Sequence, residues 1–128
     1  MTDVAARRVV LVDDEDDIRL VARASLERIA GWKVYPASSG AEGVALVRAE
    51  LPDAVVLDVM MPGMDGPATL AELRADPVTA SIPVVFLTAK VQAAERRRLE
   101  ELGAAGVVAK PFDPMTLATE LSTALGWG

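Results

Sequence analysis

The sequence predicts an α/β fold, a doubly wound five-stranded parallel sheet with helices on both faces. Short runs of β-branched and other apolar residues are bounded by turn residues, which is typical of strands buried on both faces of a parallel sheet. Longer segments between these runs carry apolar residues at helical spacing. Strand–helix units that alternate with short connections favour one sheet with right-handed crossovers.

The first two predicted strands flank one helix. Val9–Val12 is an unbroken apolar run and is predicted to be the first strand. Apolar positions at helical spacing within Ile18–Ile29 predict a helix, and Gly31 ends it because glycine readily adopts left-handed backbone. A shorter strand is predicted at Trp32–Tyr35, closed by Pro36.

The middle of the chain is predicted to hold the second helix, the third strand and the third helix. Ser39 is a suitable N-cap for a helix that stops before Pro52, since the residue before a proline disfavours helical backbone. Asp53–Leu57 is predicted to be the third strand. The third helix is expected at Pro67–Ala75, where the proline occupies a tolerated first-turn position.

The last third of the chain is predicted to hold two further strand–helix units. Val84–Leu87, introduced by a proline, is the fourth strand, and Val91–Leu102 is the helix after it. Two glycines bracket the turn into the fifth strand, Val107–Ala109. Asp113, followed by a proline at the first helical position, is expected to open a final helix that ends at Leu125.

The length of 128 residues suits a single domain, expected over residues 1–128 with a core at about residues 8–125. Strand order cannot be read from periodicity alone. Among doubly wound folds we choose the flavodoxin-like order 2-1-3-4-5.

The composition limits the chemistry that the chain can perform. The absence of cysteine excludes disulfides, thiol catalysis and cysteine-ligated zinc, and the absence of histidine removes the commonest general base. A net charge of -6 gives no electrostatic support for binding nucleic acid. The first eight residues form no apolar signal core, and no apolar run approaches membrane-spanning length. A cytoplasmic protein without membrane insertion is therefore expected.

Reactive side chains stand where four of the predicted strands end. Asp13-Asp14 follow the first strand, Asp58 the third, Thr88 the fourth and Lys110 the fifth. The carboxyl ends of parallel strands line the ligand crevice of such a sheet, so these groups are expected at one edge. Carboxylates, a hydroxyl and an ammonium together suit a hard cation and a phosphoryl group.

These residues belong to four ordered motifs: Asp13-Asp14, the segment Asp58–Gly66 with the sequence DVMMPGMDG, Thr88-Ala89 and Lys110-Pro111-Phe112. In this order and spacing they resemble the receiver domain of bacterial two-component response regulators, as stand-alone chemotaxis regulators have it. The resemblance covers about residues 8–125, and four ordered motifs are far more specific than one aspartate pair. It implies a signalling domain that catalyses only its own phosphorylation and dephosphorylation.

The resemblance implies a phosphoacceptor and a metal site. Asp58 would accept the phosphoryl group as a mixed anhydride, a role that carboxylates fill elsewhere in covalent catalysis. The cofactor would be Mg²⁺, which prefers oxygen ligands. Asp14 and Asp58 would bind it directly, Asp13 largely through a water molecule, and Met60 through its backbone carbonyl.

The resemblance also implies a switch. Lys110 would balance the carboxylates at rest and bond a phosphoryl oxygen afterwards, and Thr88 would turn its hydroxyl onto another. Many receivers carry an aromatic residue three positions before this lysine, and it turns inward when the threonine moves. This chain has Val107 there, so the aromatic half of the usual switch is absent or replaced. Met60 and Lys90 occupy positions that tune phosphoryl lifetime in the family.

The implied partners are proteins. The phosphoryl group would come from a histidine of a sensor kinase or phosphotransfer protein, so the receiver needs no histidine of its own. An unknown downstream target would bind the face made by the fourth helix, the fifth strand and the fifth helix, or the phosphoryl group would pass along a relay. The chain would be a stand-alone regulator or, alternatively, the excised receiver of a larger one.

Other interpretations compete for several residues. Glu15–Asp17 are more simply acidic residues favoured at a helix N-terminus, and Thr88 could cap the fourth helix. Arg96 and Arg97 each have a glutamate four residues on, as a solvated helix face does. A magnesium-dependent phosphatase with an aspartyl-phosphate intermediate is a rival function, but it needs an acid/base two residues after the nucleophile, where Met60 stands.

Overall fold

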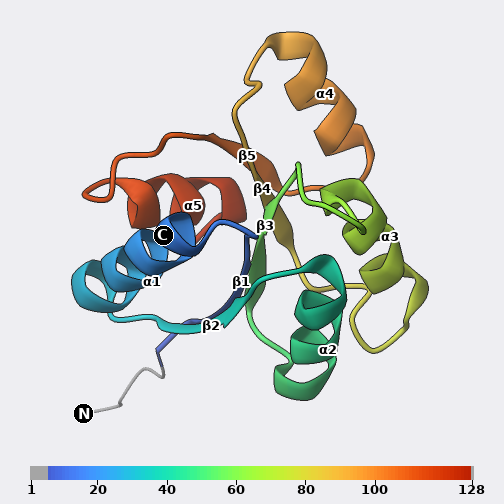
Figure 1. The fold of residues 1–128 in the computed structure, drawn as a ribbon, viewed down its shortest axis with the longest axis horizontal. Coiled ribbons are helices and arrows are strands. Elements are labelled where there is room, and N and C mark those ends of the chain that lie inside the picture. Colours follow the sequence, from blue (N-terminus) through green and yellow to red (C-terminus); the bar gives the residue numbers. More distant parts are fainter. Residues whose placement is uncertain (1–5, 128) are drawn as a thin grey trace.

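The computed structural model describes residues 6–127 and contains a five-stranded sheet flanked by five helices (Figure 1). Residues 1–5, part of the segment for which the sequence predicts no signal, lie outside the described residues. The strands are β1 Arg8–Val12, β2 Lys33–Ala37, β3 Ala54–Asp58, β4 Val84–Thr88 and β5 Gly106–Ala109. The helices are α1 Asp16–Ala30, α2 Gly40–Glu50, α3 Gly66–Ala75, α4 Ala93–Glu101 and α5 Leu117–Leu125. In the part of the chain that the structure describes, no helix combines the length and apolar character needed to span a membrane.

The strands are all parallel and lie in the order β2-β1-β3-β4-β5, which confirms the predicted fold class and strand order. Helices α1 and α5 cover one face of the sheet, and α2, α3 and α4 lie on the other (Figure 1). The register places Val12 beside Leu57 and Asp58 beside Leu87. The carboxyl ends of the central strands therefore finish at one edge.

The central strands are largely apolar because they are buried on both faces. Successive side chains of a strand point to opposite faces. Val10 and Val12 pack beneath α2 and α3, whereas Val9 and Leu11 pack beneath α1 and α5. All four side chains are fully buried. The central strands form a rigid base for the residues at their ends.

Local sequence signals set several of the helix ends. Gly31 has a φ of 71° and donates its N–H to the carbonyl of Leu26, so α1 ends where predicted. The side chain of Ser39 accepts the N–H of Glu42 and caps α2 as expected. Asp65 caps α3 in the same way.

The observed bounds of β2 and α5 differ from the prediction. Strand β2 continues through Pro36 to Ala37 because it lies at the edge of the sheet, where a proline without an N–H is tolerated. Helix α5 begins at Leu117 instead of Asp113. The Asp113 side chain accepts the N–H of Met115 at 2.8 Å, which forms a separate turn before the helix.

Helix α4 is shorter than predicted and is weakly anchored. It covers Ala93–Glu101, and Leu99 is its one buried residue among positions that are all described. Its ion pair joins Arg98 to Glu95 at 2.6 Å, one turn apart. The sequence instead predicts pairing of Arg96 and Arg97 with the glutamates four residues after them. A helix held by one buried side chain is the element most easily displaced.

Candidate functional site

The structure brings the predicted site residues together at one edge of the sheet. Asp13 follows β1, Asp58 and Thr88 are the last residues of β3 and β4, and Lys110 follows β5. Asp58, Thr88 and Lys110 line a small cavity together with Glu15. The gathering follows from topology, because parallel strands present their carboxyl ends on the same side.

Lys110 is the cation at the centre of this cluster. Its Nζ atom lies 3.1 Å from Oδ2 of Asp13, 3.3 Å from Oδ2 of Asp58 and 3.4 Å from Oε1 of Glu15. The lysine side chain is 12% exposed. Burial alone would lower the pKa of Lys110, but its hydrogen bond to Asp13 and the charges of Asp13 and Asp58 outweigh burial and raise it. The ammonium is charged at neutral pH.

Asp58 lies in an environment that opposes its ionisation. Burial raises its pKa from 3.8 to about 6, and the negative charge of Asp13 adds to the effect, while Lys110 offsets part of it. The Oδ2 atom of Asp58 is buried and accepts no hydrogen bond from any residue that the structure describes, although Lys110 forms an ion pair with it at 3.3 Å. A buried carboxylate oxygen without a donor needs a compensating positive charge.

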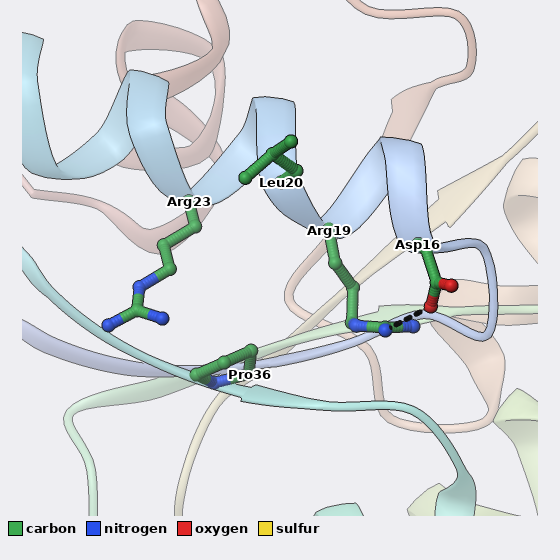
Figure 2. Close-up of a pocket in the computed structure, with 5 residues that line it drawn as sticks. All are labelled: Asp16, Arg19, Leu20, Arg23 and Pro36. Carbon is green, nitrogen blue, oxygen red and sulfur yellow. Dashed lines mark hydrogen bonds and ion pairs between the residues drawn. The ribbon is translucent and has the colours of Figure 1, made fainter.

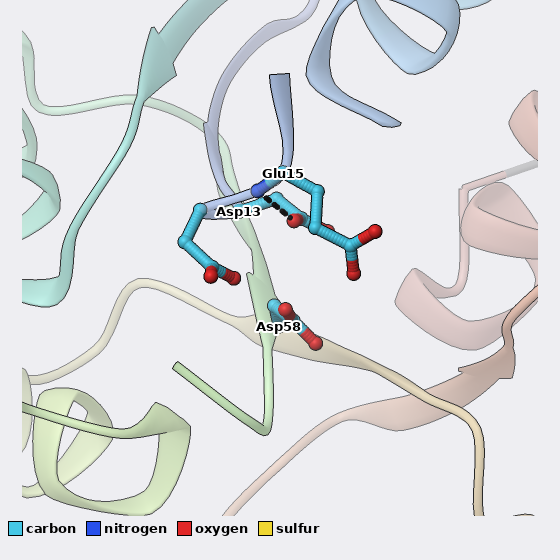
Figure 3. A group of neighbouring side chains, drawn as sticks. Asp13, Glu15 and Asp58 are labelled. Atoms are coloured by element: carbon cyan, nitrogen blue, oxygen red, sulfur yellow. Dashed lines mark hydrogen bonds between the residues drawn. The ribbon is translucent and has the colours of Figure 1, made fainter. Parts of the chain in front are cut away.

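The acidic groups fit a divalent cation. Asp13, Asp14, Glu15 and Asp58 each offer a carboxylate oxygen, and these oxygens lie within 4.8 Å of one another. Figure 3 shows the labelled carboxylates at the ends of β1 and β3. One ammonium cannot neutralise four carboxylates. A hard cation with oxygen ligands would supply the missing charge and coordinate the Oδ2 atom of Asp58, which accepts no hydrogen bond from the described residues.

The loop between β1 and α1 holds Asp13 firmly. The backbone N–H of Glu15 donates to Oδ1 of Asp13 at 2.9 Å (Figure 3). The backbone of Asp13 donates to the carbonyl of Ala37 at 3.1 Å and accepts from Nη1 of Arg19 at 2.7 Å. Asp13 is therefore fixed by both its side chain and its backbone.

A neighbouring pocket lies along α1, beside this loop. It is lined by Asp16, Arg19, Leu20, Arg23 and Pro36 (Figure 2). Arg19 forms an ion pair with Asp16 there, and Arg23 pairs with Glu27 at 3.3 Å. Both guanidinium groups already form ion pairs with carboxylates. The residues of this pocket therefore stabilise the loop, and the pocket is a poor anion site.

Thr88 is buried beside the cavity but does not cap α4. Its Oγ1 atom accepts the backbone N–H of Lys90 at 3.0 Å. The N-cap position of α4 belongs to Gln92. Thr88 is thus tied to the loop that leads to α4, and the capping interpretation is wrong.

Met60 and Val107 occupy contrasting positions. Met60 is 73% exposed at the mouth of the cavity, so its side chain offers nothing to the carboxylates. Val107 is buried and belongs to the same core cluster as Phe86 and Leu99. The side chain of β5 that packs in one cluster with Leu99 of α4 is therefore aliphatic.

Gly66 allows the loop after Asp58 to fold back onto the strand. A Cβ atom at Gly66 would lie 2.5 Å from the carbonyl oxygen of Asp58 and 2.9 Å from the ring of Phe86. These distances are shorter than side chains tolerate, so only glycine fits. The glycine that closes the DVMMPGMDG motif therefore has a steric role in shaping the site.

Comparison with known proteins identifies the architecture. A family model described as the response regulator receiver domain matches residues 9–122. This chain belongs to the response regulator receiver family. Receiver domains generally bind Mg²⁺ at an acidic pocket, and they interact with histidine kinases and downstream targets.

Relatives of this receiver domain differ in length. Protein PilH of Pseudomonas aeruginosa is 36% identical over 118 residues, which cover 92% of this chain and 97% of PilH. The probable transcriptional regulator ycf27 of Guillardia theta is 40% identical over 118 residues, which cover 92% of this chain but 45% of that protein. The chain therefore spans about half the length of the ycf27 relatives that it matches.

Solved structures share the fold of this receiver domain over nearly its whole length. Chemotaxis protein CheY4 of Vibrio cholerae matches with a TM-score of 0.86 at 30% identity, over 94% of this chain and 99% of that one. A putative response regulator from Chloroflexus aurantiacus matches with a TM-score of 0.85 at 33% identity, over 95% and 99%.

Glu15 is the site residue that the sequence interpretation missed. It was assigned to the acidic first turn of the helix, together with Asp16 and Asp17. The structure places it at the N-cap position of α1 with its carboxylate beside Lys110. The sequence signal that could have identified Glu15 is its position directly after Asp13-Asp14.

Proposed function

We propose that this chain is a phosphorylation-controlled receiver in which Asp58 accepts a phosphoryl group from a histidine of a sensor kinase or phosphotransfer protein, in a reaction that depends on Mg²⁺. The observation that carries the proposal is the position of Asp58. Its carboxylate ends a central strand, borders a cavity and keeps a buried oxygen without a hydrogen bond from the described residues. Lys110 lies 3.3 Å away.

The proposed transfer uses the carboxylate as nucleophile. An oxygen of Asp58 forms a bond to phosphorus, and the bond from phosphorus to the donor's imidazole nitrogen breaks, with its electron pair leaving on that nitrogen. The product is an acyl phosphate. Phosphoryl transfer requires mainly positioning and charge neutralisation. The positive charge of Lys110, whose pKa is raised beside Asp13, contributes to the neutralisation.

The metal ligands in this proposal are Asp14 and Asp58 directly, Asp13 through a water molecule, and the backbone carbonyl of Met60. Bound Mg²⁺ supplies positive charge where the phosphoryl oxygens gather. The acidic cluster supports this assignment by its charge and oxygen donors. The residues themselves bind the cation and hold the acceptor oxygen in place.

The proposed output is a change in protein binding. The hydroxyl of Thr88 turns onto a phosphoryl oxygen, releases the loop before α4, and alters the face formed by α4, β5 and α5. A groove runs along β5 on that face, lined by residues of all three elements. The downstream target binds there, either to a stand-alone regulator or to the receiver of a longer one.

The rival phosphatase function lacks the required proton-transfer group. Such an enzyme needs an acid/base two residues after the nucleophile, and that residue is Met60. The exposed thioether of Met60 cannot exchange a proton. Signalling is therefore the better supported function.

Labelling with acetyl phosphate and Mg²⁺ tests the proposal. Wild-type protein should acquire one acyl phosphate that is labile to base and hydroxylamine. Asp58→Asn should abolish labelling, while Asp17→Asn, the same change at an exposed residue of α1, should keep it. Labelling of the Asp58→Asn variant would contradict the assignment. If Asp58 is confirmed as the acceptor, phosphotransfer profiling with candidate kinases would identify the donor.

A further inference from the structure

We infer that Glu15 is a positioning residue that accepts a hydrogen bond from Lys110 at rest and gives up that contact to the phosphoryl group. The inference rests on the proposed function and adds to it a residue that sets the affinity of the site for phosphoryl groups. It begins from the three carboxylates around one ammonium: Asp13, Asp58 and Glu15.

Two of these carboxylates accept hydrogen bonds from Lys110. An ammonium has three N–H donors and no acceptor. Nζ donates to Asp13 at 3.1 Å and to Glu15 at 3.4 Å, and its contact with Asp58 at 3.3 Å is an ion pair without a hydrogen bond. A phosphoryl group bound to Asp58 would therefore compete with Glu15 for the ammonium.

Glu15 is the partner that can leave at the lowest cost. Its side chain is 60% exposed, whereas those of Asp13 and Asp58 are 0% and 4% exposed. Its oxygen is also the most distant of the three, at 3.4 Å. A released Glu15 carboxylate regains water, while a released buried carboxylate would lose its partner without solvation.

The buried partners are held by other contacts as well. Asp13 accepts the backbone N–H of Glu15 and has its own backbone bonded on two sides. The link from Glu15 to Asp13 uses backbone, so it persists when the Glu15 carboxylate swings away. Displacement of Glu15 from Lys110 therefore leaves the position of Asp13 intact.

Glu15 also borders the space that a phosphoryl group would enter. The cavity has a volume of about 160 Å³ and is lined by Glu15, Asp58, Met60, Thr88, Ala89 and Lys110. A carboxylate at its wall repels an incoming phosphoryl group as well as competing for Lys110. Both effects weaken binding of the phosphoryl group, and both disappear when the charge of Glu15 is removed.

Beryllofluoride, a phosphoryl mimic, gives a direct test by calorimetric titration in saturating Mg²⁺. Glu15→Gln preserves the size of an exposed side chain and removes its charge, so folding is not at risk. It should tighten beryllofluoride binding by about threefold to fivefold, the upper range for an exposed ion pair. Asp17→Asn removes the same charge from the first turn of α1 and should change the affinity by less than about 1.5-fold.

Mg²⁺ binding in the absence of beryllofluoride separates positioning from ligation. Glu15→Gln should weaken Mg²⁺ binding by only about twofold to threefold, because it removes a nearby charge and no ligand. A loss of tenfold or more would make Glu15 a metal ligand and overturn the inference. Equal beryllofluoride affinities of Glu15→Gln and Asp17→Asn, or weaker binding by Glu15→Gln, would overturn it as well. Wild-type protein that binds no beryllofluoride in Mg²⁺ would refute the proposed function itself, and the inference with it.

Discussion

The hydroxyl of Thr88 accepts a hydrogen bond from the backbone N–H of Lys90 at 3.0 Å. This bond connects the end of a central strand to the loop before α4, the helix that a single buried side chain anchors. A hydroxyl that turns toward a phosphoryl oxygen must give up this orientation. We therefore expect the state of Thr88 to be coupled to the position of α4 through the backbone.

Thr88→Ala should separate phosphorylation from response. The variant should still accept phosphate, because the acceptor oxygen of Asp58 and the carboxylates remain. It should lose most of the change in amide exchange that beryllofluoride induces in α4 and β5, because the sensing hydroxyl is gone. Thr88→Ser restores a hydroxyl and should restore the response. A full response in Thr88→Ala would contradict the coupling.

Val107→Ala should affect stability more than signalling. Removing two methyl groups from a side chain that is 6% exposed should cost about 1–2 kcal/mol of unfolding free energy. Denaturant titration measures this loss, and Val78→Ala, the same change at an exposed position, should stay within about 0.5 kcal/mol. The amide-exchange response should persist, since valine has no ring to rotate. A response abolished in Val107→Ala and retained in Thr88→Ala would reverse these roles.

Mg²⁺ should raise the melting temperature of this protein. The clustered carboxylates repel one another, and a cation that binds only the folded state stabilises it by mass action. At ten times the dissociation constant the gain is roughly 1.4 kcal/mol. Asp14→Ala should remove most of this gain, whereas Asp17→Ala should keep it. Unchanged melting in millimolar Mg²⁺, with no heat of binding, would argue against the metal site.

The sequence predicts the strand ends well because their signal is simple. Apolar runs buried on both faces must be strands of a parallel sheet, and their carboxyl ends must meet. This reasoning predicts that Asp13, Asp58, Thr88 and Lys110 lie at one edge of the sheet. The same reasoning gives no distances. It could not show that Lys110 contacts three carboxylates.

Other features escaped prediction because neighbouring structure decides them. Pro36 was expected to close β2, but edge position makes its missing N–H harmless. Asp113 and its proline are equally good signals for a helix start and for the turn that forms. Glu15 was assigned to a helix terminus, and it occupies that terminus and contacts Lys110. The same acidic residue therefore has two roles, one at the helix terminus and one in the site.

The raised pKa of Asp58 predicts how stability depends on pH in metal-free protein. Burial, with the charge of Asp13, raises the pKa to about 6 in the folded state, above its ordinary value of 3.8. The folded protein then binds a proton that the unfolded chain has released, so the contribution of Asp58 to stability rises as pH falls from about 7 to about 4.

Asp58→Asn isolates this contribution, because asparagine resembles the protonated carboxyl at every pH. In EDTA at pH 7 the variant should be more stable than wild type by on the order of 2–3 kcal/mol, measured by denaturant titration. The difference should shrink as pH falls through 6 and vanish below about pH 3, where wild-type Asp58 is protonated in both states. Saturating Mg²⁺ at pH 7 should shrink it too, since the cation stabilises the ionised carboxylate. A wild-type protein that is the more stable of the two at pH 7 without metal would show that Lys110 outweighs burial at this carboxylate.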